Sequence, residues 1–267
     1  GPVAQRLSKA IGVPYSVKAR GADIHYWGKR RGTKGLVGQA AEGAAGLLAV
    51  SAAMRRSMID MGIEGDKIRV HYTGVYLDRF QIADRDVAKA ALGFAGKPVI
   101  LSVGALIPRK GQELLIRALP AIPDAVLLLA GHGPDRTALE RLGAELGVED
   151  RLGMLGAVAH GDLPGLYAAA DVMALPSASE GLANAWVEAL ACGTPVVISD
   201  VGGARELVDR PEAGQIVERT PEAIADAIRA ILAAPPQREA VRETALRFTW
   251  SANGDTLLDH LQRIAAT

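Results

Sequence analysis

The sequence has few of the features that mark disulfide-rich, membrane-spanning or nucleic-acid-binding proteins. It contains one cysteine, Cys192, which excludes an internal disulfide framework and is typical of a reducing compartment. Its apolar runs fall short of the roughly 20 residues that a membrane-spanning helix needs. Lys plus Arg and Asp plus Glu number 30 each, so the formal net charge is zero. Because a general polyanion binder normally has a basic excess, we expect no nucleic acid as a principal partner.

The sequence also lacks an initiator methionine and a secretory signal. It opens on Gly1-Pro2, which is typical of a protease scar or a truncation point. Together with the single cysteine, this predicts a cytoplasmic setting. Hydrophobic residues make up 49% and charged residues 22%, a composition that can bury a core and excludes a disordered chain. The length of 267 residues allows one large domain or two ordinary ones.

From about residue 98, short apolar runs alternate with segments of helical period. The runs show no polar alternation, as expected of parallel strands that are covered on both faces. This order predicts an α/β fold with a doubly wound parallel sheet and right-handed crossovers, complete within residues 96–247. The predicted strands lie at 98–103, 125–130, 152–155, 171–175, 195–199 and 215–217, with helices between them such as 112–119, 135–146 and 221–232.

The first 95 residues contain roughly three predicted strands, at 15–18, 46–50 and 67–70. Three strands are few for a free-standing α/β domain, so we expect a partial N-terminal Rossmann-like domain, with a small independent domain as the alternative. A polar, Ala/Gly-rich stretch at 78–97 is the predicted linker. The final segment, 248–267, has apolar residues at helical spacing. It is either the last core helix of the second domain or a helix that crosses back to the first.

The most informative stretch runs from Leu175 to Val197, where a predicted strand, a turn-rich loop and a helix follow one another. Ligands of open parallel sheets bind outside the carboxyl ends of the strands, so this loop faces the expected site. The backbone N–H groups of Leu182, Ala183 and Asn184 would lie at the positive end of the helix and suit a pair of phosphates. Gly181 would let the backbone approach a ligand without a Cβ between them.

Two carboxylates, Glu180 and Glu188, bracket this predicted helix start with seven residues between them. An ionised carboxylate only accepts hydrogen bonds, so it suits the vicinal diol of a ribose or hexose and repels phosphate. A diphosphate on the amides and sugar hydroxyls on the carboxylates would satisfy both preferences. By spacing alone, however, two glutamates on an exposed helix are more often solvated surface.

The run Glu-Gly-x6-Glu-Ala-x-Ala-Cys-Gly-Thr-Pro-Val-Val, which ends at Val197, resembles the signature of glycosyltransferase family 4, a group of retaining enzymes with the GT-B fold. The resemblance implies a complete C-terminal donor-binding domain and an N-terminal, acceptor-side domain of which most is missing. It extends in weaker form to a donor-phosphate loop at 102–111, a Gly-rich turn at 130–135, a segment beside the nucleotide base at 155–158, a helix start at 201–206, and the tail of the first domain at 19–24, 49–51 and 72–76.

The same resemblance implies roles for single residues. Glu180 would hold hydroxyls of the transferred sugar and Glu188 the ribose of the nucleotide. Arg109 and Lys110 would neutralise the charge on the departing diphosphate, and fixed cations there stabilise the transition state more than the ground state. Without the resemblance, this pair would be an exposed basic turn. The predicted catalytic residues are Arg109, Lys110 and Glu180, and the predicted donor-binding residues are Gly104, Gly131, Val158, Gly181, Leu182, Ala183, Asn184 and Glu188.

Two departures from the family pattern affect this prediction. Many members have an Arg where this chain has Ala105, so we expect Arg109 to supply the guanidinium. Many also have a His before the Gly that here follows Arg20. Arg20 and Asp23 are candidate cleft residues, with a plain turn as the alternative, and His132 could reach the ligand or be a bystander.

The other histidines show no metal-ligand spacing, so the sequence predicts metal-independent chemistry with no cofactor. The predicted reaction moves a sugar from a nucleoside diphosphate sugar to a hydroxyl of a glycan, lipid-linked or small-molecule acceptor, with retention, in cell-envelope polysaccharide biosynthesis. We expect this fragment to be weak or inactive. The alternatives are a non-catalytic nucleotide-sugar-binding module and a GT-B sugar-nucleotide epimerase. The basic stretch 29–34 is either a solvated loop or a peripheral contact with the inner face of a membrane.

Overall fold

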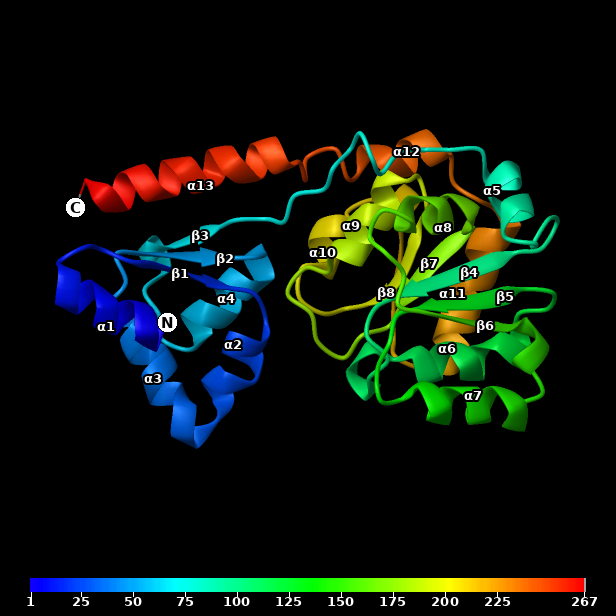
Figure 1. Cartoon of the computed structure of the whole chain (residues 1–267), viewed down its shortest axis with the longest axis horizontal. Helices are drawn as coiled ribbons and strands as arrows, with labels where there is room; N and C mark the ends of the chain where they lie inside the picture. The colour runs from blue at the N-terminus through cyan, green and yellow to red at the C-terminus, as the bar shows by residue number, and fades with distance from the viewer. Residues whose placement is uncertain (267) are drawn as a thin grey trace. The chain divides into compact units, whose positions relative to one another are not determined.

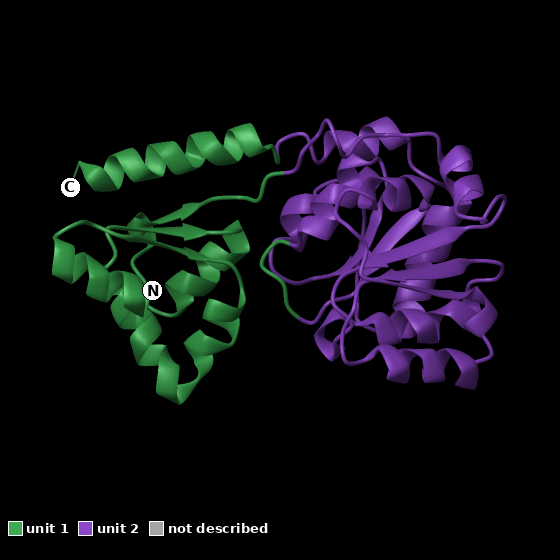
Figure 2. Cartoon of the chain, viewed as in Figure 1, with its two compact units in different colours: residues 1–74, 179–182, 248–267 green, residues 75–178, 183–247 purple. Residues whose placement is uncertain are grey.

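The computed structural model describes residues 1–266 and divides into two compact units (Figure 2). Unit 1 contains residues 1–74, the short segment Ser179–Leu182 and the segment that begins at Phe248. Unit 2 contains residues 75–178 and 183–247. The units therefore differ from the predicted ranges in two places, because residues 75–95 group with unit 2 and Ser179–Leu182 groups with unit 1.

Unit 2 is built on six parallel strands in the order β6-β5-β4-β7-β8-β9 (Figure 1). All six predicted strands of this region are confirmed. The chain fills one side of the sheet from β4 outward and then returns to β7 on the other side of β4, so the order reverses between β4 and β7. In an open parallel sheet this reversal opens a crevice at the carboxyl ends of the strands. The strands are β4 (Val99–Val103), β5 (Val126–Ala130), β6 (Leu152–Gly156), β7 (Val172–Leu175), β8 (Val196–Ser199) and β9 (Gly214–Val217).

Helices cover both faces of this sheet, so the predicted doubly wound fold is confirmed (Figure 1). The helices α6, α7 and α11 pack on one face, and α8 and α9 pack on the other, where α5 and α12 extend the layer. These helices are α5 (Arg85–Ala91), α6 (Gln112–Ala118), α7 (Arg136–Glu145), α8 (Leu163–Ala169), α9 (Asn184–Ala191), α11 (Pro221–Ala233) and α12 (Arg238–Glu243), with a short α10 (Ala204–Leu207). Single 3₁₀ turns lie at η3 (Pro108–Lys110), η4 (Leu119–Ala121), η5 (Glu149–Arg151) and η6 (Pro211–Ala213).

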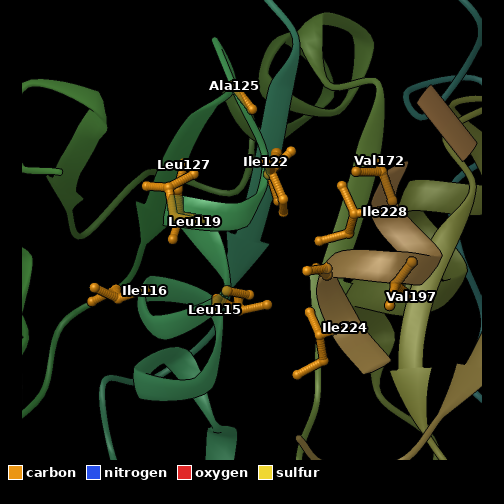
Figure 3. Packing of buried hydrophobic residues seen from close by; sticks show 14 of the residues in the cluster. Leu115, Ile116, Leu119, Ile122, Ala125, Leu127, Val172, Val197, Ile224 and Ile228 are labelled. Atoms are coloured by element: carbon orange, nitrogen blue, oxygen red, sulfur yellow. The ribbon is translucent and has the colours of Figure 1, made fainter. Parts of the chain in front are cut away.

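The main core of unit 2 lies between the sheet and the layer of α6, α7 and α11 (Figure 3). Leu115 and Leu119 approach it from α6 and the turn after it, and Ile224 and Ile228 approach from α11. Since Ile224 and Ile228 are one helical turn apart, they present one apolar face of α11. Full burial of each aliphatic side chain of this size contributes about 1.5–3 kcal/mol relative to exposure. This packing fixes the strands whose carboxyl ends border the crevice.

The predicted linker contains a helix, α5, that is anchored to the sheet of unit 2. Lys89 is buried on α5, and its Nζ lies 2.7 Å from Oδ2 of Asp171. Arg85 lies 3.4 Å from Oδ1 of the same carboxylate, and the backbone N–H of Val99 donates to Asp171 at 2.7 Å. Because a buried charge is stable only when it is paired, Asp171 fixes α5 on the sheet. The polar composition of 78–97 therefore reflects ion pairing within the unit.

Unit 1 has a three-stranded parallel sheet in the order β1-β2-β3, and the three predicted strands are confirmed. Ser51 caps the helix after β2 by accepting a hydrogen bond from the backbone N–H of Met54. None of the helices within residues 1–266 is long and apolar enough to cross a membrane. The elements are α1 (Pro2–Ile11), β1 (Ser16–Ala19), α2 (Ala22–His25), η1 (Trp27–Lys29), α3 (Arg31–Glu42), β2 (Gly46–Ala49), α4 (Ala52–Asp60), η2 (Gly65–Lys67) and β3 (Ile68–Val70).

The C-terminal helix, α13 (Trp250–Ala265), groups with unit 1, as the second of the two alternatives for this segment expected. Polar contacts with the sheet region hold it. The ring of His71 donates from Nε2 to the carbonyl of Asn253 at 3.0 Å, and Nε2 of His260 lies 2.7 Å from Oγ of Ser16. Both histidines are buried. Buried polar groups therefore join α13 to a sheet that lies far from it in the sequence.

Candidate functional site

The loops after β4 and β5 and the last residue of β6 are joined by backbone hydrogen bonds at the carboxyl edge of the unit 2 sheet. The N–H of Leu106 donates to the carbonyl of His132 at 3.0 Å, and the N–H of Gly131 donates to the carbonyl of Gly156 at 2.7 Å. These bonds join three chain segments that lie far apart in the sequence. The rim of the crevice is therefore pre-formed, which lowers the entropic cost of ordering it around a ligand.

Two glycines of the predicted donor set, Gly104 and Gly131, lie against each other on this rim. A Cβ on Gly131 would lie 1.8 Å from the carbonyl oxygen of Gly104, so a side chain there would force the two loops apart. The Lys110 amine lies close by, because Nζ is 3.9 Å from the position that a Cβ on Gly104 would take. The structure thus brings Gly104, Gly131 and Lys110 together at the carboxyl end of β4.

The basic turn at η3 (Pro108–Lys110) is fixed to the neighbouring loops on both sides. The N–H of Ala178, just after β7, donates to the carbonyl of Arg109 at 2.7 Å. Gln112 is buried, and its side-chain amide donates to the carbonyl of Ala105 at 3.0 Å. Arg109 is an exposed residue of this turn. That Arg109 takes the place of the guanidinium missing at Ala105 stays a prediction.

Helix α9 begins at Asn184 with Ala183 as its N-cap residue, so the predicted helix start is confirmed. Within residues 1–266, no side chain caps this terminus. The first N–H groups of a helix have no partner inside the helix and favour an anion. Ala183 and Asn184 belong to unit 2, and Leu182 belongs to the segment that groups with unit 1. Binding of a diphosphate by these amides stays a prediction.

Glu188 is a buried residue of α9 that is 8% exposed, so it is not a solvated surface residue. Its Oε2 accepts a hydrogen bond from the hydroxyl of Tyr167 at 3.1 Å, and its Oε1 lies 3.0 Å from Nε2 of His160. Because an ionised carboxylate only accepts, His160 donates from Nε2. Burial and the neighbouring Glu188 charge raise the pKa of Tyr167 well above its usual value, so its hydroxyl keeps the proton that it donates.

The sequence did not identify three residues that surround this carboxylate: His160, Tyr167 and Phe80. The ring of Phe80 lies 5.2 Å from that of His160 and 6.1 Å from that of Tyr167, with both pairs tilted. Phe80 precedes the first strand of unit 2, His160 follows β6 and Tyr167 lies on α8. No spacing rule links three such positions to a glutamate on α9. Only the folded chain brings them together.

Gly181 has a structural role that the sequence did not suggest. A Cβ at this position would lie 2.3 Å from the carbonyl oxygen of Arg20 and 2.6 Å from Cγ1 of Val50, both within unit 1. The space that a side chain at position 181 would take is therefore filled within unit 1, which is a second reason for a glycine there. Approach of a ligand to the Gly181 backbone stays a prediction. Glu180 is half-buried in the same segment. Its contact with a transferred sugar stays a prediction.

The remaining candidate cleft residues have ordinary local environments. The carboxylate of Asp23 accepts hydrogen bonds from the backbone N–H of Arg20 at 3.0 and 3.1 Å and from that of Gly21 at 3.0 Å. This accounts for Asp23 as a turn-stabilising residue, which is the plainer of its two alternatives. The side chains of Arg20 and His132 are exposed. Neither shows a contact that assigns it to a ligand.

Val158 lies on an apolar hollow of about 390 Å³ on unit 2, whose wall also includes Leu155, Leu166 and Leu92. Leu155 is 39% exposed, an unusual fraction for a large aliphatic residue at the end of a strand. Within residues 1–266, no group of three or more His, Cys, Asp and Glu side chains is placed to hold a metal ion. Metal-independent and cofactor-free chemistry stays a prediction.

The chain resembles known glycosyltransferases in sequence. Residues 84–248 match the family described as glycosyl transferases group 1. The D-inositol 3-phosphate glycosyltransferase of Saccharomonospora viridis is 36% identical over an alignment of 213 residues that covers 73% of this chain and 49% of that protein. The GDP-mannose-dependent α-(1-6)-phosphatidylinositol monomannoside mannosyltransferase of Mycolicibacterium smegmatis is 36% identical over an alignment of 209 residues that covers 70% of this chain and 54% of that protein. The chain thus spans about half the length of these curated relatives.

Solved structures resemble the fold over nearly the whole chain. HepE from Anabaena in complex with UDP has a TM-score of 0.89 at 25% identity, covering 98% of this chain and 75% of HepE. Sucrose-phosphate synthase from Thermosynechococcus elongatus has a TM-score of 0.88 at 28% identity, covering 99% of this chain and 71% of the synthase. The architecture of this chain is therefore the α/β architecture of GT-B proteins.

Proposed function

The chain belongs to the family of glycosyl transferases group 1, and on that premise we propose that unit 2 is the donor-binding domain of a retaining glycosyltransferase of family 4. The donor is a nucleoside diphosphate sugar, and the acceptor is a hydroxyl of a glycan, a polyol or a lipid-linked sugar. The main support is Glu188, a carboxylate that is buried, held by two donors and located on the helix that begins at Asn184. A buried charge is costly to maintain, so a carboxylate kept there is a candidate for ligand binding.

The donor would lie along the carboxyl edge of the unit 2 sheet. Its diphosphate would take the N–H groups at the start of α9 and the ammonium of Lys110, and its ribose would take Glu188. The pre-formed contact between Gly104 and Gly131 supports this arrangement, because it leaves the β4 loop without side chains beside Lys110. The base would pack near Val158, whose hollow offers an apolar wall.

In the proposed reaction, the bond between the anomeric carbon and the β-phosphate oxygen breaks, and a bond forms from that carbon to the acceptor oxygen on the same face. The acceptor proton leaves with the nucleoside diphosphate, so atoms and charge balance. Negative charge grows on the phosphate oxygens as the bond breaks. Lys110 and Arg109, on a turn fixed by Ala178 and Gln112, would stabilise that charge without reorganising. No metal or cofactor forms part of the proposal.

Relatives narrow the donors to be tested. Structures of HepE contain UDP and UDP-glucose, and the Mycolicibacterium relative is named for GDP-mannose. We infer a uridine or guanosine diphosphate sugar as donor and, from the names of both curated relatives, an inositol-containing or lipid-linked acceptor. A role in cell-envelope biosynthesis is part of the proposal. Because the chain spans about half of those relatives' length, the chain itself is tested for donor binding.

A peripheral membrane contact at the inner face is a further part of the proposal. Tyr26 and Trp27 of unit 1 are 51% and 46% exposed, and the guanidinium of Arg30 lies 4.8 and 5.8 Å from their ring centroids. Exposed aromatic residues beside basic ones suit the interface of an anionic bilayer. Co-sedimentation with phosphatidylserine vesicles, compared with phosphatidylcholine vesicles, tests the contact. Equal binding to both, or to neither, would contradict it.

Isothermal titration of the chain with UDP, GDP and their sugars tests the main proposal. We expect one of the two nucleotide series to bind, and Glu188→Gln to weaken that binding about tenfold or more, since a hydrogen bond to a charged group is worth about 1.5–3 kcal/mol. The matched control is Glu145→Gln, which removes only an exposed ion pair with Arg141 on α7 and should bind as the unaltered chain does. Absence of binding to every nucleotide at millimolar concentration would refute the proposal.

Product analysis separates the two rival functions. If the donor binds but is not consumed even when an acceptor is present, the protein is a nucleotide-sugar-binding module. Conversion of the donor into an epimer without an acceptor would indicate an epimerase. Release of nucleoside diphosphate together with a new glycosidic bond of the donor's anomeric configuration is the result that we expect.

A further inference from the structure

We propose that His160 is a positioning residue that fixes the carboxylate of Glu188 in the orientation that receives a ribose diol. This inference rests on the proposed function, in which Glu188 binds the ribose. His160 lies outside the signature that ends at Val197. His160 lies in the loop between β6 and α8, and its side chain is 52% exposed.

The hydrogen bonds at Glu188 leave room for two more. A carboxylate offers about four lone-pair sites on its two oxygens. The Tyr167 hydroxyl occupies one on Oε2 at 3.1 Å, and Nε2 of His160 occupies one on Oε1 at 3.0 Å. One site on each oxygen remains, which matches the two O–H donors of a vicinal diol. With both oxygens held, the plane of the carboxylate is fixed before a ligand arrives.

The two donors differ in burial. Tyr167 is fully buried, so it holds Oε2 from inside the core, whereas half of the His160 side chain is exposed. Without His160, Oε1 would lose the hydrogen bond at 3.0 Å, and the single hydrogen bond from Tyr167 would have to hold the carboxylate against rotation about its last torsion. Terminal torsions of this kind are broad and soft. The His160 contact therefore decides how well the carboxylate is oriented.

His160 is itself held in place by the segment that opens unit 2. The Phe80 ring lies 5.2 Å from the His160 ring at an angle of 58° and 6.1 Å from the Tyr167 ring. The guanidinium of Arg242 donates to the carbonyl of Phe80 at 2.6 Å and to that of Leu77 at 2.9 Å. Phe80 thus supports both donors at once, and it is fixed by α12.

A purely structural role is the competing explanation, in which His160 only covers Phe80. The two explanations differ in which ligands respond. A positioning residue acts through Glu188 and changes affinity only for nucleotides that have a ribose diol. A structural residue changes affinity for every nucleotide. Comparison of UDP with 2′,3′-dideoxy-UDP, or of GDP with its dideoxy analogue, separates them.

The experiment titrates four forms of the chain with both nucleotides: the unaltered chain, His160→Ala, His160→Phe and His160→Gln. His160→Phe keeps a ring against Phe80 and removes the donor, and His160→Gln keeps an N–H donor of similar reach. We expect His160→Ala and His160→Phe to weaken binding of the diol nucleotide about tenfold and to change binding of the dideoxy nucleotide less than about twofold. His160→Gln should restore most of the loss.

Equal weakening for both nucleotides, or no weakening in His160→Phe, would overturn the inference. Circular dichroism of each variant verifies the fold, and the exposed position of His160 makes all three substitutions compatible with folding. The Glu188→Gln variant distinguishes failure of this inference from failure of the proposed function. If Glu188→Gln weakens binding of the diol nucleotide and the dideoxy nucleotide equally, the proposed role of Glu188 falls. If it weakens binding of the diol nucleotide selectively and His160→Phe does not, only the role of His160 falls.

Discussion

Units 1 and 2 both contain a histidine in a polar network, buried in unit 1 and half-exposed in unit 2, and the two networks do different things. In unit 1, His71 accepts from Lys18 at 2.9 Å and donates to the carbonyl of Asn253, so the network joins α13 to the sheet. In unit 2, His160 donates to Glu188, so the network holds a charge on the rim of the crevice. In the first network both ring nitrogens of His71 have partners, whereas in the second each oxygen of Glu188 has one acceptor site left over. Free acceptor sites on a buried carboxylate thus distinguish a candidate ligand site from a network that only joins two elements of the fold.

The units also differ in how well their helices are covered. The main core of unit 2 buries Ile224 and Ile228 of α11 almost completely, and helices pack on both faces of its sheet. In unit 1, Val3, Leu7 and Ile11 follow one another at every fourth position on α1 and are 79%, 57% and 60% exposed. An apolar stripe at this spacing is the pattern of a helix face that packs against something. The stability of the chain should therefore depend far more on α11 than on α1.

The largest expected effect tests this difference in coverage. Ile228→Ala removes a side chain that is 1% exposed, and it should destabilise unit 2 by about 2–5 kcal/mol. Leu7→Ala, on the exposed stripe of α1, should change the free energy of unfolding by about 0.5 kcal/mol or less. Urea unfolding followed by the fluorescence of Trp186, which is fully buried in unit 2, measures the first. Comparable losses from the two substitutions would show that α1 is covered in solution.

A smaller effect tests whether the diphosphate site belongs to unit 2 and not to unit 1. Lys110→Met should weaken nucleoside diphosphate binding about tenfold or more, because a charge-assisted hydrogen bond is worth about 1.5–3 kcal/mol. The same variant should bind the free nucleoside as the unaltered chain does, since the nucleoside has no phosphate. Lys9→Met, on an exposed position of α1, is the matched control in unit 1. Titration calorimetry gives both affinities, and equal losses for nucleotide and nucleoside would remove Lys110 from the diphosphate site.

The smallest effect concerns the response of the unit 1 network to pH. Burial, followed by the charge of Lys18, lowers the pKa of His71, and burial, followed by the charge of Arg69, lowers that of His260. A histidine with a lowered pKa in the fold binds protons more readily when unfolded. The contribution of such a histidine to the free energy of unfolding is therefore complete above its unfolded-state pKa of about 6.5. It is lost as the pH falls through the pKa of the folded state. Asp259, which faces His260, opposes part of this shift.

We accordingly expect hydrogen exchange in α13 to accelerate between pH 7.5 and pH 5.5 after correction for intrinsic rates, with no matching change in α9. His71→Gln supplies the control, because an amide can accept from Lys18 and donate to Asn253 without titrating. This variant should lose most of the pH dependence. An unchanged pH dependence in His71→Gln would assign the effect to His260 or to another group.

Local patterns predicted much of the fold. Apolar runs such as Val126–Ala130 and Val172–Leu175 are strands because both faces of the sheet are covered, and that coverage is visible as an absence of alternation. The start of α9 was equally predictable from a strand, a turn-rich loop and an apolar helical period. The linker was mistaken because Lys89 is buried only through its pairing with Asp171, and a pairing across 82 positions leaves no local pattern.

The candidate site was only partly predictable, because contacts between distant elements leave no local pattern in the sequence. The signature identified Glu188, and the structure shows that this residue is buried and held. The donors His160 and Tyr167 come from other elements, and nothing in the sequence near either one indicates a partner on α9. Gly181 shows what a motif leaves out, since the close approach of the Arg20 carbonyl oxygen to this position is a tertiary contact with no local pattern. Residue type and spacing predict which elements meet, and side-chain contacts decide what each residue does there.

Hydrogen exchange of the chain with and without saturating UDP or GDP tests most directly whether unit 2 binds a diphosphate at the start of α9. We expect the bound nucleotide to slow exchange in residues 104–111 and 183–190 and to leave α1 and α3 unchanged. Slowed exchange in α1 and α3 alone, with residues 183–190 exchanging as in the free chain, would contradict the account.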